Sequence, residues 1–161
     1  MKTISWNCRG IGNPATAREL CGLAKAYAPS ILFIMKTQID KYRVENLRYS
    51  LGFDSSFAVK SSGRSGGLGL FWKNDVSLDV KKYSKYHIDT IVTENGKEPW
   101  RMSFIYEEPN RSLRYRTWDI MKQMRSDTDL PWICICDFNE ILRREEQLGP
   151  NSREEYLMEG F

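Results

Sequence analysis

The feature that most restricts the fold is a five-residue apolar stretch, ILFIM, at positions 31–35. A strand in which every residue is apolar is typical of a sheet covered on both faces. The preceding residues, 15–27, carry apolar side chains at helical spacing, which predicts a helix with one buried face. The residues of that face are Leu20, Leu23, Ala24 and Tyr27. With the alternating stretch 3–7, the order predicts an α/β fold.

The apolar period changes to two after residue 67. Alternation of this kind predicts antiparallel strands, and Asn95-Gly96 is the strongest hairpin signal in the chain. The stretch SSGRSGG at 61–67 predicts a turn. The predicted strands of this part are 68–72, 78–82, 87–93, 100–106 and, after a further helix, 132–136. The other predicted helices are 41–50 and 112–125.

Composition fits one domain with a core of its own. The chain has 161 residues, of which 41% are hydrophobic and 28% charged. No apolar stretch approaches 20 residues, so we expect no membrane span, and the N-terminus lacks the apolar core of a signal peptide. A net charge of +3 permits a nucleic-acid partner without arguing for one.

The four cysteines show neither metal-type nor disulfide-type spacing. Cys134 and Cys136 alternate with isoleucines, which predicts reduced thiols in the core of an intracellular protein of unspecified compartment. The other two are Cys8 and Cys21.

The apolar run 132–136 leads directly into Asp137, Phe138 and Asn139. Asp and Asn are common turn formers, so one interpretation is an ordinary strand end. Asp-x-Asn at this place also puts a carboxylate and an amide on one face, an arrangement with which hydrolases hold phosphate. The residues alone leave both interpretations open.

Three stretches resemble the endonuclease domain of plant LINE-type retrotransposons. They are SWNCRGIGNP, then SGRSGGLGLFWKNDV with YSKYHIDTIV, and WRMSFIYEEPNRSLRYRTWDIM followed by LPWICICDFNEIL. That domain belongs to the exonuclease–endonuclease–phosphatase family, which includes apurinic endonucleases and deoxyribonucleases. The resemblance covers essentially the whole chain in the family's order. It implies an α/β fold, a truncated two-sheet sandwich of that family's type.

The resemblance also implies a remnant catalytic set. Hydrolysis of a phosphodiester needs a metal, a held water and a group that takes its proton. Asn7 matches the Asn that orients the family's site, and Asp137 with Asn139 matches the pair that orients water and contacts phosphate. Tyr106, in YEEP, matches the Tyr that supports developing charge. The alternatives are a turn-capping Asn7 and an ordinary strand-end Tyr106.

The sequence departs from the family where its metal ligand belongs. The family's second strand ends in a Glu, whereas this chain has Lys36. An ammonium cannot ligate a hard cation and repels it, so we expect no cofactor. Asp40 is the nearby candidate to replace the Glu, and Mg²⁺ enters only if the chain is an endonuclease after all.

The second departure is length. The sequence ends at Phe161, so the resemblance implies that residues 1–161 form a single incomplete domain without the family's C-terminal half and its terminal His. The one histidine, His87, precedes the Asp-x-Asn and is interpreted as a half-exposed strand residue. We therefore expect catalysis to be lost, with an Mg²⁺-dependent DNA endonuclease as the alternative.

Basic residues interleaved with aromatics suit nucleic-acid binding. Candidates for weak contacts are Arg64, Arg111 and Arg114. Because Glu107 and Glu108 dilute this charge, a solvated surface is the better interpretation. A non-cleaving nucleic-acid binder, in which Lys36 meets the phosphate, is a further alternative.

The shortened domain also predicts association. In the family, chain that follows the Asp-x-Asn builds much of the second sheet, so the inner face of the first sheet is expected to lose its cover here. A large exposed apolar face is unfavourable for a monomer. We therefore expect a homo-oligomer or an obligate protein partner. The candidates for the exposed face are Leu68, Leu70, Trp72, Val92, Met102 and Phe104.

Overall fold

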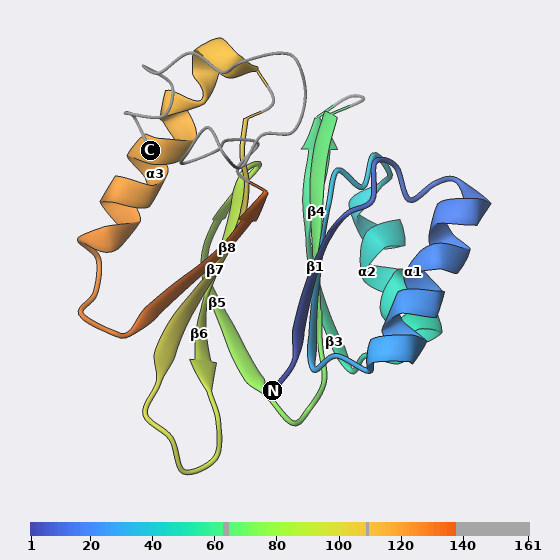
Figure 1. Ribbon diagram of the computed structural model, residues 1–161, viewed down its shortest axis with the longest axis horizontal. Helices are drawn as coiled ribbons and strands as arrows, with labels where there is room; N and C mark the ends of the chain where they lie inside the picture. The colour runs from blue at the N-terminus through green and yellow to red at the C-terminus, as the bar shows by residue number, and fades with distance from the viewer. Residues whose placement is uncertain (63–64, 109, 138–161) are drawn as a thin grey trace, which may run out of the picture. The chain divides into compact units, whose positions relative to one another are not determined.

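The computed structural model describes residues 1–62, 65–108 and 110–137 (Figure 1). The chain divides into two compact units. The first contains Met1–Tyr106 and Leu130–Cys136, and the second contains Glu107–Asp129 and resumes at Asp137. The two are described separately below.

The first sheet of the first unit has the strand order β1-β2-β4-β3. Its strands are β1 (Thr3–Asn7), β2 (Ile31–Met35), β3 (Ser55–Ser62) and β4 (Ser65–Trp72). β1 and β2 are parallel, whereas β4 runs antiparallel to β2 and β3. All five residues of β2 are buried, which confirms that this strand is covered on both faces.

Two helices cover the outer face of the first sheet, α1 (Pro14–Tyr27) and α2 (Lys41–Leu51) (Figure 1). Asn13 and Asp40 cap them, each accepting a hydrogen bond from the backbone two residues ahead. The predicted apolar stripe of α1 is confirmed at Leu20 and Ala24 but is wrong at Tyr27, which is 52% exposed. Tyr27 is the last residue of the helix, where the chain turns away through a left-handed Ala28.

The second sheet has the order β5-β6-β7-β8. Its strands are β5 (Ser77–Ser84), β6 (His87–Thr93), β7 (Trp100–Tyr106) and β8 (Trp132–Asp137). The turn between β6 and β7 contains Gly96 at φ +75°, and Lys97 N–H donates to the Glu94 carbonyl at 3.1 Å. The hairpin predicted from Asn95-Gly96 is confirmed.

The two sheets pack face to face. The rings of Phe33 in β2 and Phe104 in β7 lie 5.1 Å apart between centroids. The core between the sheets contains five of the six residues predicted to be uncovered, and Trp72 packs against it partly buried. The prediction of an uncovered inner face is wrong, because β5, β6 and β7 precede the Asp-x-Asn and already cover the first sheet. Self-association stays a prediction, but an uncovered inner face no longer supports it.

The glycine-serine stretch at 61–67 was predicted as a turn, and the antiparallel pairing of β3 with β4 confirms that the chain reverses within it. Two long strands, β3 and β4, pair through it as far as Ser62 and Ser65. β3 itself was not predicted, because SSFAVKSS carries few apolar residues. Ala58 is buried against the helices, while Phe57 and Val59 pack against the core between the sheets.

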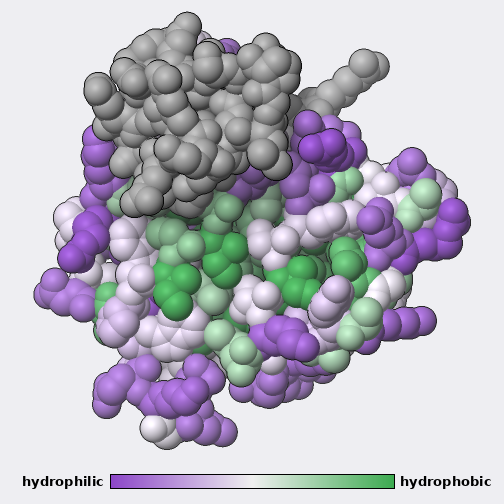
Figure 2. All heavy atoms as spheres, in the orientation of Figure 1, coloured by the Kyte–Doolittle hydropathy of each residue, from purple (hydrophilic) through white to green (hydrophobic). Residues whose placement is uncertain are grey.

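The apolar run of β8 is only half-buried. Ile133 is 51% exposed, and Cys134 and Cys136 are of intermediate exposure, so their placement in the core is wrong. The reason is that β8 is the last strand of its sheet. Figure 2 shows apolar side chains gathered on the face of the molecule where β1 and β8, one edge strand of each sheet, lie.

The second unit contains a 3-10 helix (Arg111–Leu113) and α3 (Tyr115–Arg125). Thr117 and Met124 are the buried residues of α3, and Glu108 N–H donates to the Thr117 hydroxyl at 3.2 Å. No helix among the described residues is long and apolar enough to cross a membrane.

Candidate functional site at the ends of β1 and β2

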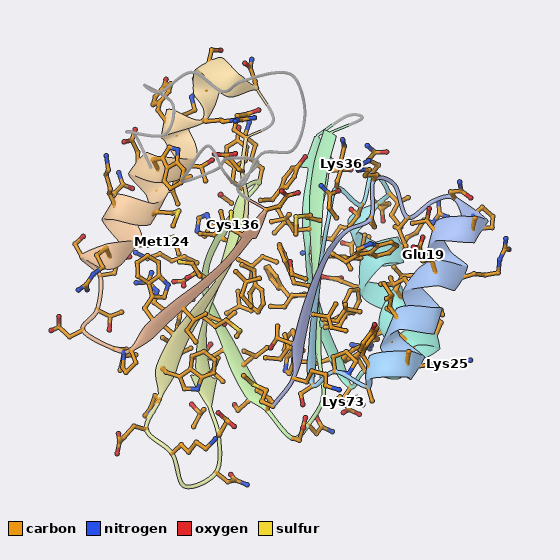
Figure 3. All side chains as sticks on the ribbon, in the orientation of Figure 1. Glu19, Lys25, Lys36, Lys73, Met124 and Cys136 are labelled. Atoms are coloured by element: carbon orange, nitrogen blue, oxygen red, sulfur yellow. The ribbon has the colours of Figure 1, made fainter. Side chains whose placement is uncertain are left out.

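The site is built where β1 and β2 end side by side. Asn7 pairs with Met35, the last residue of β2, and Met35 pairs on its other side with Leu68 of β4. Because β1 and β2 are parallel, the chain after each strand leaves at the same edge of the sheet. Figure 3 shows Lys36 at this end of the sheet and Lys73 at the opposite end.

The two loops that follow continue the pairing of the strands. Cys8 N–H donates to the Met35 carbonyl at 3.1 Å, and Gly10 N–H donates to the Lys36 carbonyl at 2.9 Å. The Cys8 thiol also donates to the Met35 carbonyl at 3.1 Å, and burial raises the pKa of this thiol. Backbone hydrogen bonds therefore join the two loops to each other.

Three residues of these loops have left-handed backbone without being glycine. Arg9, Lys36 and Gln38 have φ of +49°, +59° and +57°. Such conformations cost of order 1–3 kcal/mol each and gather at functional sites. The strained segment is the one that places the Lys36 side chain.

Lys36 follows β2 directly, where the resemblance expects a carboxylate. Among the described residues its contacts are made by its carbonyl oxygen, and its ammonium has no hydrogen bond or ion pair. Asp40, the predicted substitute ligand, caps α2 and accepts from Tyr42 N–H at 2.9 Å. The carboxylate that was the nearby candidate to replace the Glu is thus engaged at the helix terminus.

Thr37 is a feature that the sequence did not indicate. It is completely buried, its N–H donates to the Gly67 carbonyl at 3.1 Å, and its hydroxyl has no partner among the described residues. A Cβ at Gly67, whose φ is +85°, would come within 2.3 Å of that hydroxyl oxygen. Gly67 is therefore required for β4 to pass the loop.

Tyr106 ends β7 and is 4% exposed. Its N–H donates to the Tyr86 carbonyl at 2.8 Å, and its ring belongs to the core between the sheets. This placement is compatible with both interpretations of Tyr106, an ordinary aromatic residue at a strand end and a residue of the catalytic set. The catalytic role of Tyr106 stays a prediction.

The other predicted site residues are only partly described. Asp137 ends β8, and its closeness to Asn7 stays a prediction; Asn139 and Arg64 lie outside the described residues. Arg111 begins the 3-10 helix. The Arg114 Nε lies 3.5 Å from a carboxylate oxygen of the buried Glu107. This carboxylate offsets part of the positive charge that Arg114 would offer to a nucleic acid.

His87 was predicted to be half-exposed, and this is wrong. It is 7% exposed, and its Nδ1 lies 2.8 Å from the Ser84 hydroxyl across the β5–β6 turn. Burial lowers the pKa of His87, an effect opposed by the Asp89 carboxylate.

Comparison with known proteins rests on structure. No protein-family profile and no curated protein sequence matches the chain. The AP endonuclease LMAP from Leishmania major aligns with a TM-score of 0.64 at 14% identity, over 94% of this chain and 59% of that one. The catalytic domain of APE2 from Xenopus laevis aligns with 0.64 at 16%, over 94% and 62%.

The chain has the endonuclease/exonuclease/phosphatase fold. The endonuclease domain of TRAS1, a telomere-specific non-LTR retrotransposon, also shares it, with a TM-score of 0.54 at 14% identity over 84% of this chain and 57% of that one. The chain thus spans about three-fifths of the length of these structures. At such identities the likeness establishes the fold.

Proposed function

We propose that this chain is a protein of the nuclease fold that binds nucleic-acid phosphates through Lys36 and does not hydrolyse them. The observation that carries the proposal is the place of Lys36, directly after β2 and one residue beyond the partner of Asn7. The resemblance expects a metal-binding Glu at this position. In this chain the ammonium of Lys36 stands there instead of a carboxylate.

The sign of the charge at position 36 decides whether the site suits a phosphate or a metal cation. Two unit charges 4 Å apart interact by about 4 kcal/mol at an effective dielectric near 20. An ammonium therefore attracts a phosphate and repels a divalent cation about twice as strongly at equal distance. Of the oxygen donors at the ends of β1 and β2, Asp40 is engaged as a helix cap and Asn7 is neutral. These residues do not suit Mg²⁺, which prefers carboxylates and water.

Two assays test the proposal together. Purified protein is incubated with supercoiled plasmid and Mg²⁺ or Mn²⁺, and we expect no nicked product. Binding of a fluorescent oligonucleotide is then followed by anisotropy in EDTA, and we expect binding that weakens with salt, because phosphate contacts release counterions. Binding that requires the metal would contradict the proposal.

A second candidate is a metal-dependent endonuclease related to LINE-type retrotransposon enzymes. The likeness to the TRAS1 endonuclease domain and the place of Asp137 at the end of β8 support it. In that case the plasmid is nicked in Mg²⁺, and Asp137→Ala abolishes the nicking. The same plasmid assay therefore separates the two candidates.

We also propose association with a second copy or with another protein through β8. This strand lies last in its sheet and exposes Ile133, and free strand edges favour association. Light scattering at low micromolar concentration is expected to show a two-fold dimer when no other protein is present, and a monomer would leave only the other protein as partner. The four free cysteines support an intracellular location.

A further inference from the structure

The solvent side of α2 carries two of the most exposed aromatic residues of the structure. Tyr42 is 73% exposed and Tyr49 is 71% exposed. Seven residues separate them, which is close to two helical turns, so both rings project from the same side of the helix. Asn46 lies between them and is also exposed. The opposite side of α2 is buried through Val44 and Leu51.

The charges on this side of α2 are positive. Arg43 is exposed beside Tyr42, and Arg48 lies beside Tyr49. The acid of the helix, Glu45, is turned towards the sheet, where it accepts from Ala58 N–H at 3.3 Å and pairs with Lys41 at 3.7 Å. The exposed residues of α2 are therefore aromatic, neutral polar or basic, with no acid among them.

One of the two rings is already held in place. The Arg48 guanidinium lies 4.6 Å from the centroid of the Tyr49 ring, and its Nη2 donates to the Tyr49 hydroxyl at 2.6 Å. A fixed ring loses less conformational entropy when a planar group stacks on it. The Cα atoms of Tyr42 and Tyr49 are about 10 Å apart along the helix axis, at 1.5 Å per residue. That is about three nucleotides of a stacked strand at 3.4 Å each.

From this arrangement we infer that the outer side of α2, comprising Tyr42, Arg43, Asn46, Arg48 and Tyr49, is a stacking surface for single-stranded nucleic acid. Exposed aromatics supply platforms for bases of any sequence, and arginines supply phosphate contacts. The occupant is a single strand, since the bases of a duplex are stacked on each other and do not offer their faces. This surface is distinct from Lys36 and does not depend on it.

The test compares two oligomers of equal length and charge by anisotropy in EDTA. One is a fluorescent oligothymidylate, and the other is the same backbone with abasic residues. We expect the wild-type chain to bind the oligothymidylate more tightly. Tyr42→Ala and Tyr49→Ala are each expected to weaken that binding about fivefold or more and to leave the abasic oligomer unaffected. Tyr42→Phe retains the ring and is expected to bind as the wild type does, whereas Tyr49→Phe retains the ring but loses the hydrogen bond from Arg48 and is expected to bind between the wild type and Tyr49→Ala.

Tyr27→Ala, on α1, removes a comparably exposed tyrosine from another helix and is expected to change neither affinity. Equal affinity of the wild type for both oligomers would overturn the inference and leave the phosphate-binding role of Lys36 standing. Tight base-dependent binding that survives Lys36→Gln would support the inference, and the phosphate-binding role of Lys36 is then tested by whether the same variant binds the abasic oligomer more weakly. Unchanged binding in both alanine variants would overturn the inference.

Discussion

The guanidinium of Arg101 donates two hydrogen bonds of 2.8 Å each, from Nε and Nη2, to the two carboxylate oxygens of Asp89. Both residues are 2% exposed. Ser103 donates to Asp89 Oδ1 at 2.6 Å, and the Trp132 indole N–H donates to the Ser103 hydroxyl at 2.8 Å. The network therefore connects β6 and β7 with the first residue of β8.

Asp89→Ala is expected to destabilise the fold by about 3–5 kcal/mol, because it leaves the buried Arg101 charge without its bidentate partner. Chemical denaturation with urea measures the loss. Asp79→Ala is the matched control, since Asp79 pairs with Lys81 on the exposed part of β5 and is expected to change stability by at most about 1 kcal/mol. Equal effects of the two substitutions would contradict the importance of the buried pair.

Because His87 is buried, the free energy of unfolding is expected to depend on pH. Burial lowers the pKa of His87 below its ordinary value of 6.5, so the unfolded chain takes up a proton that the folded chain refuses. The contribution is complete above about pH 6.5 and is lost as the pH falls below it, at up to about 1.4 kcal/mol per pH unit. The chain has one histidine, so His87→Gln should flatten this part of the profile.

Denaturation midpoints of the wild type and His87→Gln between pH 7.5 and 5.5 provide the measurement. Carboxylates contribute equally to both proteins, and the difference between the two profiles isolates the imidazole. Parallel profiles would show that the pKa of His87 is the same in the folded and the unfolded chain, which would contradict the lowering by burial.

The thiol of Cys134 is expected to be alkylated slowly in the folded chain. Burial raises the pKa of Cys134 to about 11, with the Asp89 carboxylate adding to the rise and the Arg101 guanidinium opposing it. Since the thiolate is the reactive form, iodoacetamide at pH 8 should modify Cys134 about a hundredfold more slowly in the folded chain than in urea. Mass spectrometry of the peptide that contains Cys134 gives the rate. Equal rates with and without urea would contradict the raised pKa.

The sequence allowed much of the fold to be predicted where the pattern is local. The apolar β2, the helix α1 and the Asn95-Gly96 hairpin are each encoded by a few neighbouring residues. β3 was missed because its burial comes from α2 and the second sheet, which packs on Phe57. The cover of the inner face was mistaken for the same reason: it depends on which strands pair, a long-range property.

The candidate site divides in the same way. The resemblance located Lys36, and Asp40 directly before the predicted helix is a local N-cap signal, but the left-handed backbone of Lys36 comes from how two loops pack, which no local pattern encodes. The burial of Thr37 and its need for Gly67 join residues that are thirty positions apart. In the sequence, His87 belongs to an alternating strand, for which half-exposure is expected. Its burial is visible only in the three-dimensional structure.

Restoring a carboxylate should not restore a metal site. Lys36→Glu is expected to bind Mg²⁺ weakly at most, because a single carboxylate beside a neutral Asn7 supplies too few charged ligands. It is also expected to bind the abasic oligomer more weakly in EDTA, since its charge now repels phosphate. Isothermal titration calorimetry with Mg²⁺ measures the first effect. Tight binding of Mg²⁺ by this variant would show that the remaining ligands were intact.

The most direct test of the account is the salt dependence of oligonucleotide binding by Lys36→Gln in EDTA. A lysine that contacts one phosphate contributes about one to the slope of log K against log salt concentration. We predict that the slope falls by about one in Lys36→Gln, stays unchanged in Lys36→Arg, and stays unchanged in Lys25→Gln, which removes an exposed lysine of α1. An unchanged slope and affinity in Lys36→Gln would contradict the claim that Lys36 has replaced the metal as the cation that meets the phosphate.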